Sequence, residues 1–312
     1  MIQHSLGIPP DLARWQGFRE RIYGEVFTQG RDALFELLDA LLDRGPVSSL
    51  VELSLSAFFR RAWPSVYAAL QDGCINAPAL GRVAVDHLPP AERPLLVLDG
   101  VPWLLPEART LPDRGVQHVA TTLYTREKLG VGYAYSTLGV VPEESGSWFL
   151  PVAQERVPTT SDDLTVGAQQ VRTWAPLLPR RGVLVVDSKY GEGFLDLLAP
   201  LEHPLTPNAK DCTVADPAAS PVDVLGRLKG NRTFYFQPPA YPGQGRPCVH
   251  GAALRFLDES TWPEPDQEEI VQDPRWGQVR LRAWHHLHSE EHPAREVTIV
   301  LIERAGASGS RR

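Results

Sequence analysis

The stretch Arg181–Leu198, RGVLVVDSKYGEGFLDLL, places an aspartate directly after four apolar residues. The apolar run Val183–Val186 is typical of a strand that is buried inside a sheet. A second apolar run, in Pro94–Gly100 (PLLVLDG), ends in the same way at Asp99. We therefore expect two buried strands, each of which ends in a carboxylate.

The residues between these two runs predict how the strands are arranged. Three stretches favour strands, namely Val116–Tyr124, Gly132–Val141 and Ser147–Gln154. A helix should then begin at Thr160–Asp163 and continue to Leu178. Crossover connections are right-handed and consecutive strands usually lie side by side, so the strand ending at Asp187 should return beside the strand ending at Asp99. The expected fold class is α/β (α+β), with a ribonuclease-H-like mixed sheet flanked by helices.

The sequence indicates three domains. Residues 1–88 should be helical, because leucines recur at the spacing of one helix face between Leu34 and Leu42. Residues 89–200, after the break at Pro89-Pro90, should form the ribonuclease-H-like core. Residues 201–312 should form a β-rich subdomain, with short strands in Asp223–Leu228, Arg232–Gln237, Gln278–His286 and Glu296–Glu303.

Composition limits the class of protein. The 312 residues are 43% hydrophobic and 22% charged, which is ordinary for a soluble globular protein. No apolar run approaches the roughly 20 residues that span a bilayer, so we expect no membrane partner. The first residues lack the layout of a secretory signal, and the three cysteines are widely spaced, so we expect a cytoplasmic protein. The net charge of -7 counts against a dedicated nucleic-acid binder but allows a local basic face.

Asp99 and Asp187 suggest a metal site. Two carboxylates about 4 Å apart repel each other by roughly 4 kcal/mol at an effective dielectric constant of 20. A bound cation removes this repulsion, and ligands that are all oxygen select Mg²⁺ or Mn²⁺. Two such ions can catalyse reactions of phosphodiesters. A single aspartate at a strand end usually caps a turn, but two at neighbouring strand ends favour the metal site.

Several motifs resemble those of a known family. Asp99, Trp103, Pro106-Glu107-Ala108 and Pro112-Asp113-Arg114 resemble the first-aspartate motif of DDE transposases of bacterial insertion sequences. Asp187 with Tyr190 resembles the second motif, and Gly132–Ser136 resembles a strand between them. Further matches occur in the β-rich insertion and in the N-terminal helices, at Leu225–Phe234, His250-Gly251, Thr261–Pro265, Arg31–Leu42 and Ser48–Leu53.

The resemblance implies cut-and-paste DNA transposition by a cytoplasmic, nucleoid-associated enzyme. Asp99 and Asp187 would be catalytic and would hold the two Mg²⁺ or Mn²⁺ ions. The partners would be double-stranded DNA, in the form of element ends and target, and a second copy of the chain in the active dimer. The helical domain of residues 1–88 would bind the DNA of the element ends. The family's third carboxylate, a glutamate on a later helix, has no match here, which suggests a truncated chain with weak or absent activity. A non-catalytic DNA-binding remnant or repressor is the alternative, and a poorly folded fragment is a third possibility.

Basic residues that could contact DNA phosphates are scattered along the chain. They are Arg60, Arg61, Arg114, Arg126, Lys128, Arg227, Lys229 and Arg232. A segment from Trp284 to His292 holds four histidines, and His286 and His288 would share one strand face. A zinc site is conceivable there, but the absence of a nearby cysteine favours a solvated strand end.

Overall fold

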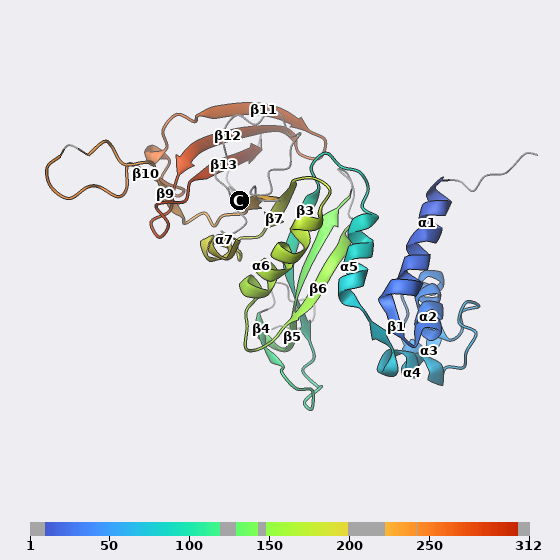
Figure 1. Cartoon of the computed structure of the whole chain (residues 1–312). Coiled ribbons are helices and arrows are strands. Elements are labelled where there is room, and N and C mark those ends of the chain that lie inside the picture. The colour runs from blue at the N-terminus through green and yellow to red at the C-terminus, as the bar shows by residue number, and fades with distance from the viewer. Residues whose placement is uncertain (1–9, 119–128, 143–147, 199–221, 242, 305–312) are drawn as a thin grey trace, which may run out of the picture. The chain divides into compact units, whose positions relative to one another are not determined.

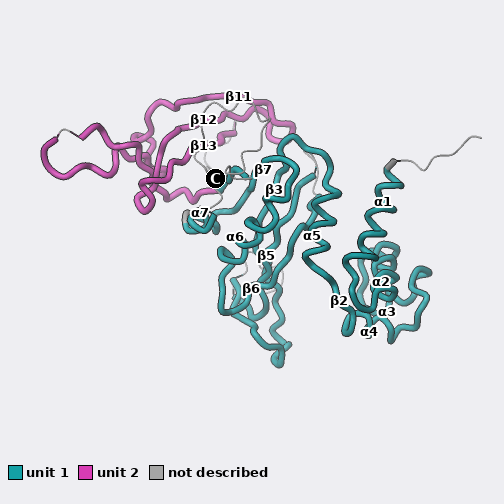
Figure 2. Tube along the Cα trace, viewed as in Figure 1, with its two compact units in different colours: residues 1–226 teal, residues 227–312 magenta. Residues whose placement is uncertain are grey.

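A computed structural model describes residues 10–118, 129–142, 148–198, 222–241 and 243–304 of the chain (Figure 1). These residues divide into two compact units, 1–226 and 227–312, and each is described by itself (Figure 2). The helices of the first unit are α1 (Pro10–Arg21), α2 (Arg31–Arg44), α3 (Leu50–Leu53), α4 (Pro64–Asp72), α5 (Ala77–Asp86), α6 (Asp163–Trp174) and α7 (Glu192–Leu198). Its strands are β1 (Phe27–Gln29), β2 (Cys74–Ile75), β3 (Leu95–Leu104), β4 (Gly115–His118), β5 (Leu129–Val141), β6 (Leu150–Val157), β7 (Gly182–Val186) and β8 (Val222–Gly226).

A mixed six-stranded sheet forms the centre of the first unit. The order of its strands is β4-β5-β3-β7-β8, and β6 also pairs with β5. The strands β3, β5 and β6 are antiparallel neighbours, whereas β7 runs parallel to both β3 and β8. The expected return of the Asp187 strand to the side of the Asp99 strand is therefore confirmed, and so is a fold of the α+β kind.

The strand β3 differs from the expectation that it ends at Asp99. It continues to Leu104, and Asp99 pairs with Thr137 of β5. The reason is that β5 is 13 residues long and keeps pairing with β3 after the parallel partner β7 has ended. Proline usually breaks strands because it has no amide hydrogen to donate to a neighbouring strand. Pro102 is tolerated because, among the described residues, no strand lies on the β7 side of β3 at this point.

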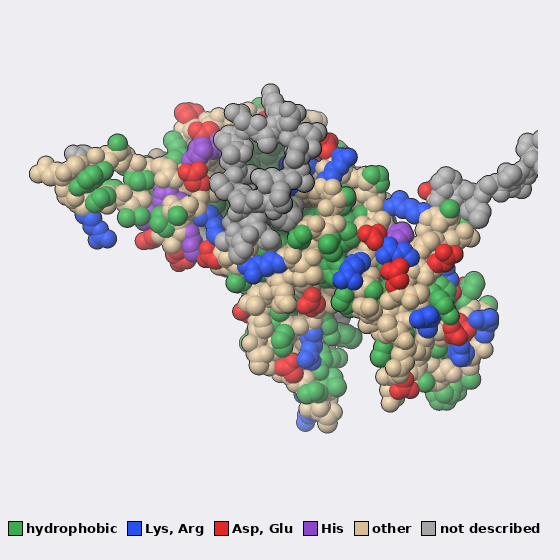
Figure 3. All heavy atoms as spheres, viewed as in Figure 1, with side chains coloured by type: hydrophobic (Ala, Val, Ile, Leu, Met, Phe, Trp, Pro, Cys, Tyr) green, Lys and Arg blue, Asp and Glu red, His purple; other side chains and the backbone are tan. Residues whose placement is uncertain are grey.

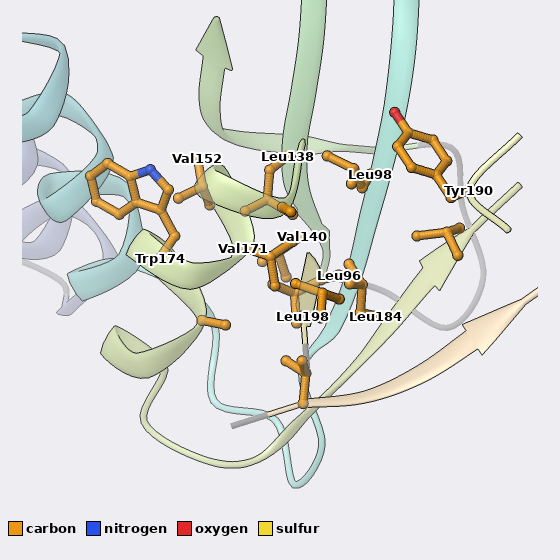
Figure 4. Packing of buried hydrophobic residues seen from close by; sticks show 14 of the residues in the cluster. Leu96, Leu98, Leu138, Val140, Val152, Val171, Trp174, Leu184, Tyr190 and Leu198 are labelled. Carbon is orange, nitrogen blue, oxygen red and sulfur yellow. The ribbon is translucent and has the colours of Figure 1, made fainter. Parts of the chain in front are cut away.

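One face of the sheet is packed against helices and forms the main core (Figure 4). Alternate residues of the strands, such as Leu98, Leu138 and Leu184, are buried on this face. The helix α6 covers them with Val171 and Trp174, and α5 and α7 add further apolar side chains to the same cluster. The start of α6 is the predicted one, because the Asp162 side chain accepts a hydrogen bond of 2.8 Å from the Thr165 amide.

The block of α1 to α5 is helical, as expected for residues 1–88, with its own apolar clusters. The leucine pattern predicted the helix α2 correctly, but only some of these leucines are buried in it. Leu34 and Leu37 are buried, whereas Leu41 and Leu42 are 45% and 60% exposed. Glu36 occupies the buried face instead.

The second unit is built mainly of strands. It contains β9 (Thr233–Tyr235), β10 (Ala253–Arg255), β11 (Gln267–Asp273), β12 (Gly277–Leu287) and β13 (Val297–Arg304). The strands β9 and β10 form one antiparallel pair, and β11, β12 and β13 form an antiparallel sheet. Phe234, Trp284 and Leu287 lie in the core that these strands share.

The stretch Asp223–Leu228 was expected in the β-rich subdomain but belongs in part to the central sheet. Its residues up to Gly226 lie in β8, which pairs with β7 along five residues. The compact unit of strands therefore begins at Arg227 rather than at residue 201. The apolar pattern of a short strand does not reveal which sheet the strand joins, because that choice depends on tertiary packing.

The described part of the chain contains no helix that is both long enough and apolar enough to cross a membrane.

Candidate functional site

Asp99 and Asp187 lie abreast on neighbouring parallel strands. The register of β3 and β7 pairs Leu98 with Val186. Asp99 directly follows Leu98 in the sequence, and Asp187 directly follows Val186. Because parallel strands keep their residues level, the two carboxylates leave the paired region at the same end of the sheet. The prediction that the two residues are neighbours is thus confirmed, although only β7 ends there.

Asp99 belongs to the sheet face opposite the helices, and Asp187 is exposed in the turn after β7. Side chains alternate between the faces of a strand, and the buried Leu96 and Leu98 point towards α6. Asp99 is exposed and shares its face with Val101 and Trp103, which are 48% and 58% exposed. The carboxylates can therefore be reached by a solvated cation and by a large substrate.

The backbone orients the side chain of Asp99. The amide of Gly100 donates a hydrogen bond of 2.8 Å to Asp99 Oδ1. This bond holds Oδ1 against the backbone of the next residue. The amide of Tyr190 donates to the carbonyl of Asp187 at 2.9 Å, which closes the turn after β7.

The side chain of Tyr190, three residues after Asp187, belongs to the main core cluster (Figure 4). Its side chain is 3% exposed and stacks edge-on against Phe194, with 5.0 Å between the ring centroids. Burial is the main cause that raises the pKa of the Tyr190 phenol, followed by the negative charges of Asp163 and Asp99. The phenol therefore stays protonated and neutral in the core.

A pair of buried polar side chains, which the sequence analysis did not identify, adjoins this position. Ser136 Oγ donates a hydrogen bond of 2.7 Å to Gln170 Oε1, and Gln170 Nε2 donates one of 3.1 Å to the Ser136 carbonyl. Both residues are 0% exposed. Ser136 pairs in register with Gly100, so this bonded pair ties α6 to the strands that carry the candidate site.

Asp163 and Lys189 form an ion pair that sequence reasoning also missed. Asp163 was recognised only as part of a helix start, and Lys189 only as a residue between two motif positions. The two lie 26 positions apart in the sequence, so no local pattern connects them. The sequence offered one indication that Lys189 could belong to the site, namely its position two residues after Asp187.

Asp99 and Asp187 fit a Mg²⁺ or Mn²⁺ ion better than a metal that needs a full set of protein ligands. The described residues contain no group of three or more His, Cys, Asp or Glu side chains that could hold a metal ion. Mg²⁺ in proteins is often held by only one or two carboxylates, together with water and substrate phosphates. Two exposed aspartates side by side meet that requirement.

Arg60 and Arg61, which were expected to contact DNA, bind a buried carboxylate. Glu36 is 7% exposed, and it accepts hydrogen bonds from the Arg60 amide at 3.1 Å and from the Arg60 guanidinium at 2.9 Å. The Nε atom of Arg61 lies 3.3 Å from the same carboxylate. These contacts give both arginines a structural role, because a buried charge needs such partners.

We expect Glu36→Gln to lower the free energy of unfolding by about 1–2 kcal/mol, because charge-assisted bonds to a buried group are lost. The Arg60 side chain is 79% exposed, which keeps the loss below that of a fully buried pair. Urea denaturation followed by circular dichroism measures the change. Glu20→Gln, at an exposed position on α1, is the control. Equal transition midpoints for the two variants would contradict the structural role.

The other basic residues lie in separate parts of the chain. Arg114 donates a hydrogen bond of 2.7 Å to the carbonyl of Leu105, so it fixes the segment after β3. Arg227, Lys229 and Arg232 are exposed at the start of the second unit. Arg126 and Lys128 lie outside the described residues. In the view of Figure 3 the Lys and Arg side chains are scattered among acidic ones, without a continuous basic patch.

The histidines near the end of β12 do not share one face as expected. A register shift follows Trp284, and His286 adopts a φ of 55°. His286 Nδ1 lies 2.9 Å from Glu296 Oε2 at the surface, whereas His288 is 0% exposed. His288 Nε2 lies 2.9 Å from His250 Nδ1, so the two imidazoles are hydrogen-bonded to each other.

We expect the second unit to lose stability in acid because of His288. Burial, and then the neighbouring His250, lower the pKa of His288, and Glu296 acts in the opposite direction. Below a pH of about 6.5 the unfolded chain takes up a proton that the folded His288 resists, so stability falls as the pH falls. Each unit by which this pKa is lowered is worth about 1.4 kcal/mol.

Denaturation of the wild type and of His288→Gln between pH 7 and pH 5 tests this dependence. The wild type should lose more stability than the variant over this interval. His118→Gln, at an exposed position of β4, should retain the wild-type dependence. An unchanged acid dependence in His288→Gln would contradict the assignment.

No protein-family model matches this chain, and no curated protein matches its sequence.

Proposed function

We propose that this chain is a DDE-type transposase that uses Mg²⁺ or Mn²⁺ at Asp99 and Asp187 to act on DNA phosphodiesters. The observation that carries the proposal is the level position of the two exposed aspartates on neighbouring parallel strands. The strand order and directions of the central sheet agree with a ribonuclease-H-like core, which the motifs around Asp99 and Asp187 also imply.

The residues of the chain have distinct roles in this proposal. Asp99 and Asp187 supply oxygen ligands on a face that a DNA backbone can reach, and the Gly100 amide holds Asp99 Oδ1 in place. Two bound ions would activate the attacking oxygen and stabilise the leaving oxygen of the phosphodiester. Tyr190, which is buried in the core cluster, stays neutral and adds no charge of its own.

The partners follow from the same proposal. Element ends and target DNA are the expected substrates, in the nucleoid-associated cytoplasm, and two copies of the chain would bring two ends together. The exposed residues Arg227, Lys229 and Arg232 remain candidates for phosphate contacts. The guanidinium groups of Arg60, Arg61 and Arg114 bind groups of the protein, so a phosphate would compete with those bonds.

A second candidate function is DNA binding without catalysis, as in a repressor. It is favoured by the lack of a third metal-binding side chain near Asp99 and Asp187 among the described residues. The two functions share their DNA partner and differ in whether phosphodiesters are broken.

One experiment separates the two functions. The purified chain is incubated with a supercoiled plasmid that carries the DNA on both sides of its gene, with and without Mg²⁺ or Mn²⁺. Metal-dependent nicking that is lost in Asp99→Ala supports the transposase. Binding in a gel-shift assay without nicking supports the repressor. A chain that neither binds nor nicks this DNA would rule out both functions.

A further inference from the structure

Lys189 links the turn after β7 to the start of α6. Its ammonium group pairs with Asp163 Oδ2, and Asp163 is the first residue of α6. The side chain of Asp163 is 19% exposed and that of Lys189 is 50% exposed. The other oxygen of Asp163 is buried and has no hydrogen-bond partner among the described residues, so Lys189 is the main compensation for this carboxylate.

The ion pair also lies against β3 at Gly100. A Cβ atom placed on Gly100 would be 3.2 Å from Lys189 Nζ and 3.5 Å from Asp163 Oδ1. Gly100 is the residue after Asp99, and its amide donates to the Asp99 carboxylate. The pair therefore contacts the backbone segment that orients Asp99.

The same pair acts on the turn that carries Asp187. Lys189 lies between Asp187 and Tyr190, whose amide closes the turn. The ring of Tyr190 is buried and anchors the far end of the turn in the core. Lys189 attaches the exposed part of the turn to α6 and lies beside β3.

We propose that Lys189 and Asp163 are positioning residues, which hold the Asp187 turn against Gly100 and so set the separation of the two carboxylates. This inference rests on the proposed function in so far as it concerns metal binding. The charges alone predict a different result, because the Lys189 ammonium repels a divalent cation and Asp163 attracts one. The sign of the effect of Lys189 on metal affinity therefore distinguishes positioning from simple electrostatics.

The first test measures Mn²⁺ binding to the full chain by electron paramagnetic resonance. We expect Lys189→Met and Asp163→Asn each to weaken binding about tenfold, as for residues that orient metal ligands. The double variant should bind no more weakly than the weaker single variant, because the two residues act as a unit. Tighter binding in Lys189→Met would overturn the proposal. The exposed pair of Arg280 and Glu268 provides matched controls, Arg280→Met and Glu268→Gln, which should leave Mn²⁺ binding unchanged.

The second test is independent of metal and uses hydrogen exchange of single amides in the full chain. The amides of Tyr190 and Gly100 should exchange faster in both single variants than in the wild type, while amides in β12 should not change. If the wild type binds no Mn²⁺, the proposed function fails, and the exchange rates still decide whether the pair holds the turn. Unchanged exchange at Tyr190 and Gly100 in both variants would overturn the positioning role.

Discussion

Replacing Asp99 or Asp187 by asparagine is expected to weaken Mn²⁺ binding by about tenfold or more, which corresponds to at least about 1.4 kcal/mol. Each substitution removes one of the two negative charges that face the cation and keeps the size of the side chain. Asparagine at position 99 can still accept the bond from the Gly100 amide, so the local backbone should be preserved. The double variant should show no detectable binding.

Mn²⁺ titration of the wild type and the variants, followed by electron paramagnetic resonance, measures this effect. Asp72→Asn at the end of α4 is the control, because Asp72 is exposed and lies in another part of the first unit. Thermal melts in the absence of metal should show that all variants remain folded. Affinities of the Asp99 and Asp187 variants equal to that of Asp72→Asn would refute the metal site.

The second large effect concerns the buried pair of Ser136 and Gln170. We expect Gln170→Leu to lower the free energy of unfolding by about 2–3 kcal/mol, because the Ser136 hydroxyl is left buried without its partner. The double variant Ser136→Ala/Gln170→Leu should recover most of this loss, because replacing both partners by apolar groups removes the unsatisfied donor. Urea denaturation of the wild type, Ser136→Ala, Gln170→Leu and the double variant gives the coupling energy directly.

A neighbouring residue on the same helix is a suitable control for this cycle. Gln169 is exposed, so Gln169→Leu should change the free energy of unfolding by no more than about 0.5 kcal/mol. A loss for Gln170→Leu that persists unchanged in the double variant would show that packing, and not the hydrogen bonds, determines the cost.

The sequence allowed the centre of the first unit to be predicted because its signals are local. Apolar runs that end in aspartate marked β3 and β7, and Asp162 marked the start of α6. The handedness of crossover connections then placed the two strands side by side. Asp99 and Asp187 could be predicted as neighbours for this reason.

The parts that could not be predicted depend on contacts between distant residues. Glu36 is buried within an apolar helix face because Arg60, 24 positions later, returns to bind it. Likewise, Asp163 and Lys189 are brought together only by the tertiary fold. The parallel pairing of β8 with β7 could not be predicted, because the sequence of a five-residue strand does not indicate its partner. The extension of β3 beyond Asp99 required knowledge of its partner β5.

The proline within β3 has a consequence for how the protein behaves at high concentration. The last residue of β3 that pairs with β7 is Leu98, opposite Val186. Beyond Leu98 this edge of β3 has no neighbouring strand among the described residues. An extended segment of another molecule can pair with such an exposed edge and add to the sheet. Pro102 lies within this edge and lacks the amide hydrogen that continuous intermolecular pairing needs. This short stretch next to Asp99 is therefore protected against fibril-like growth.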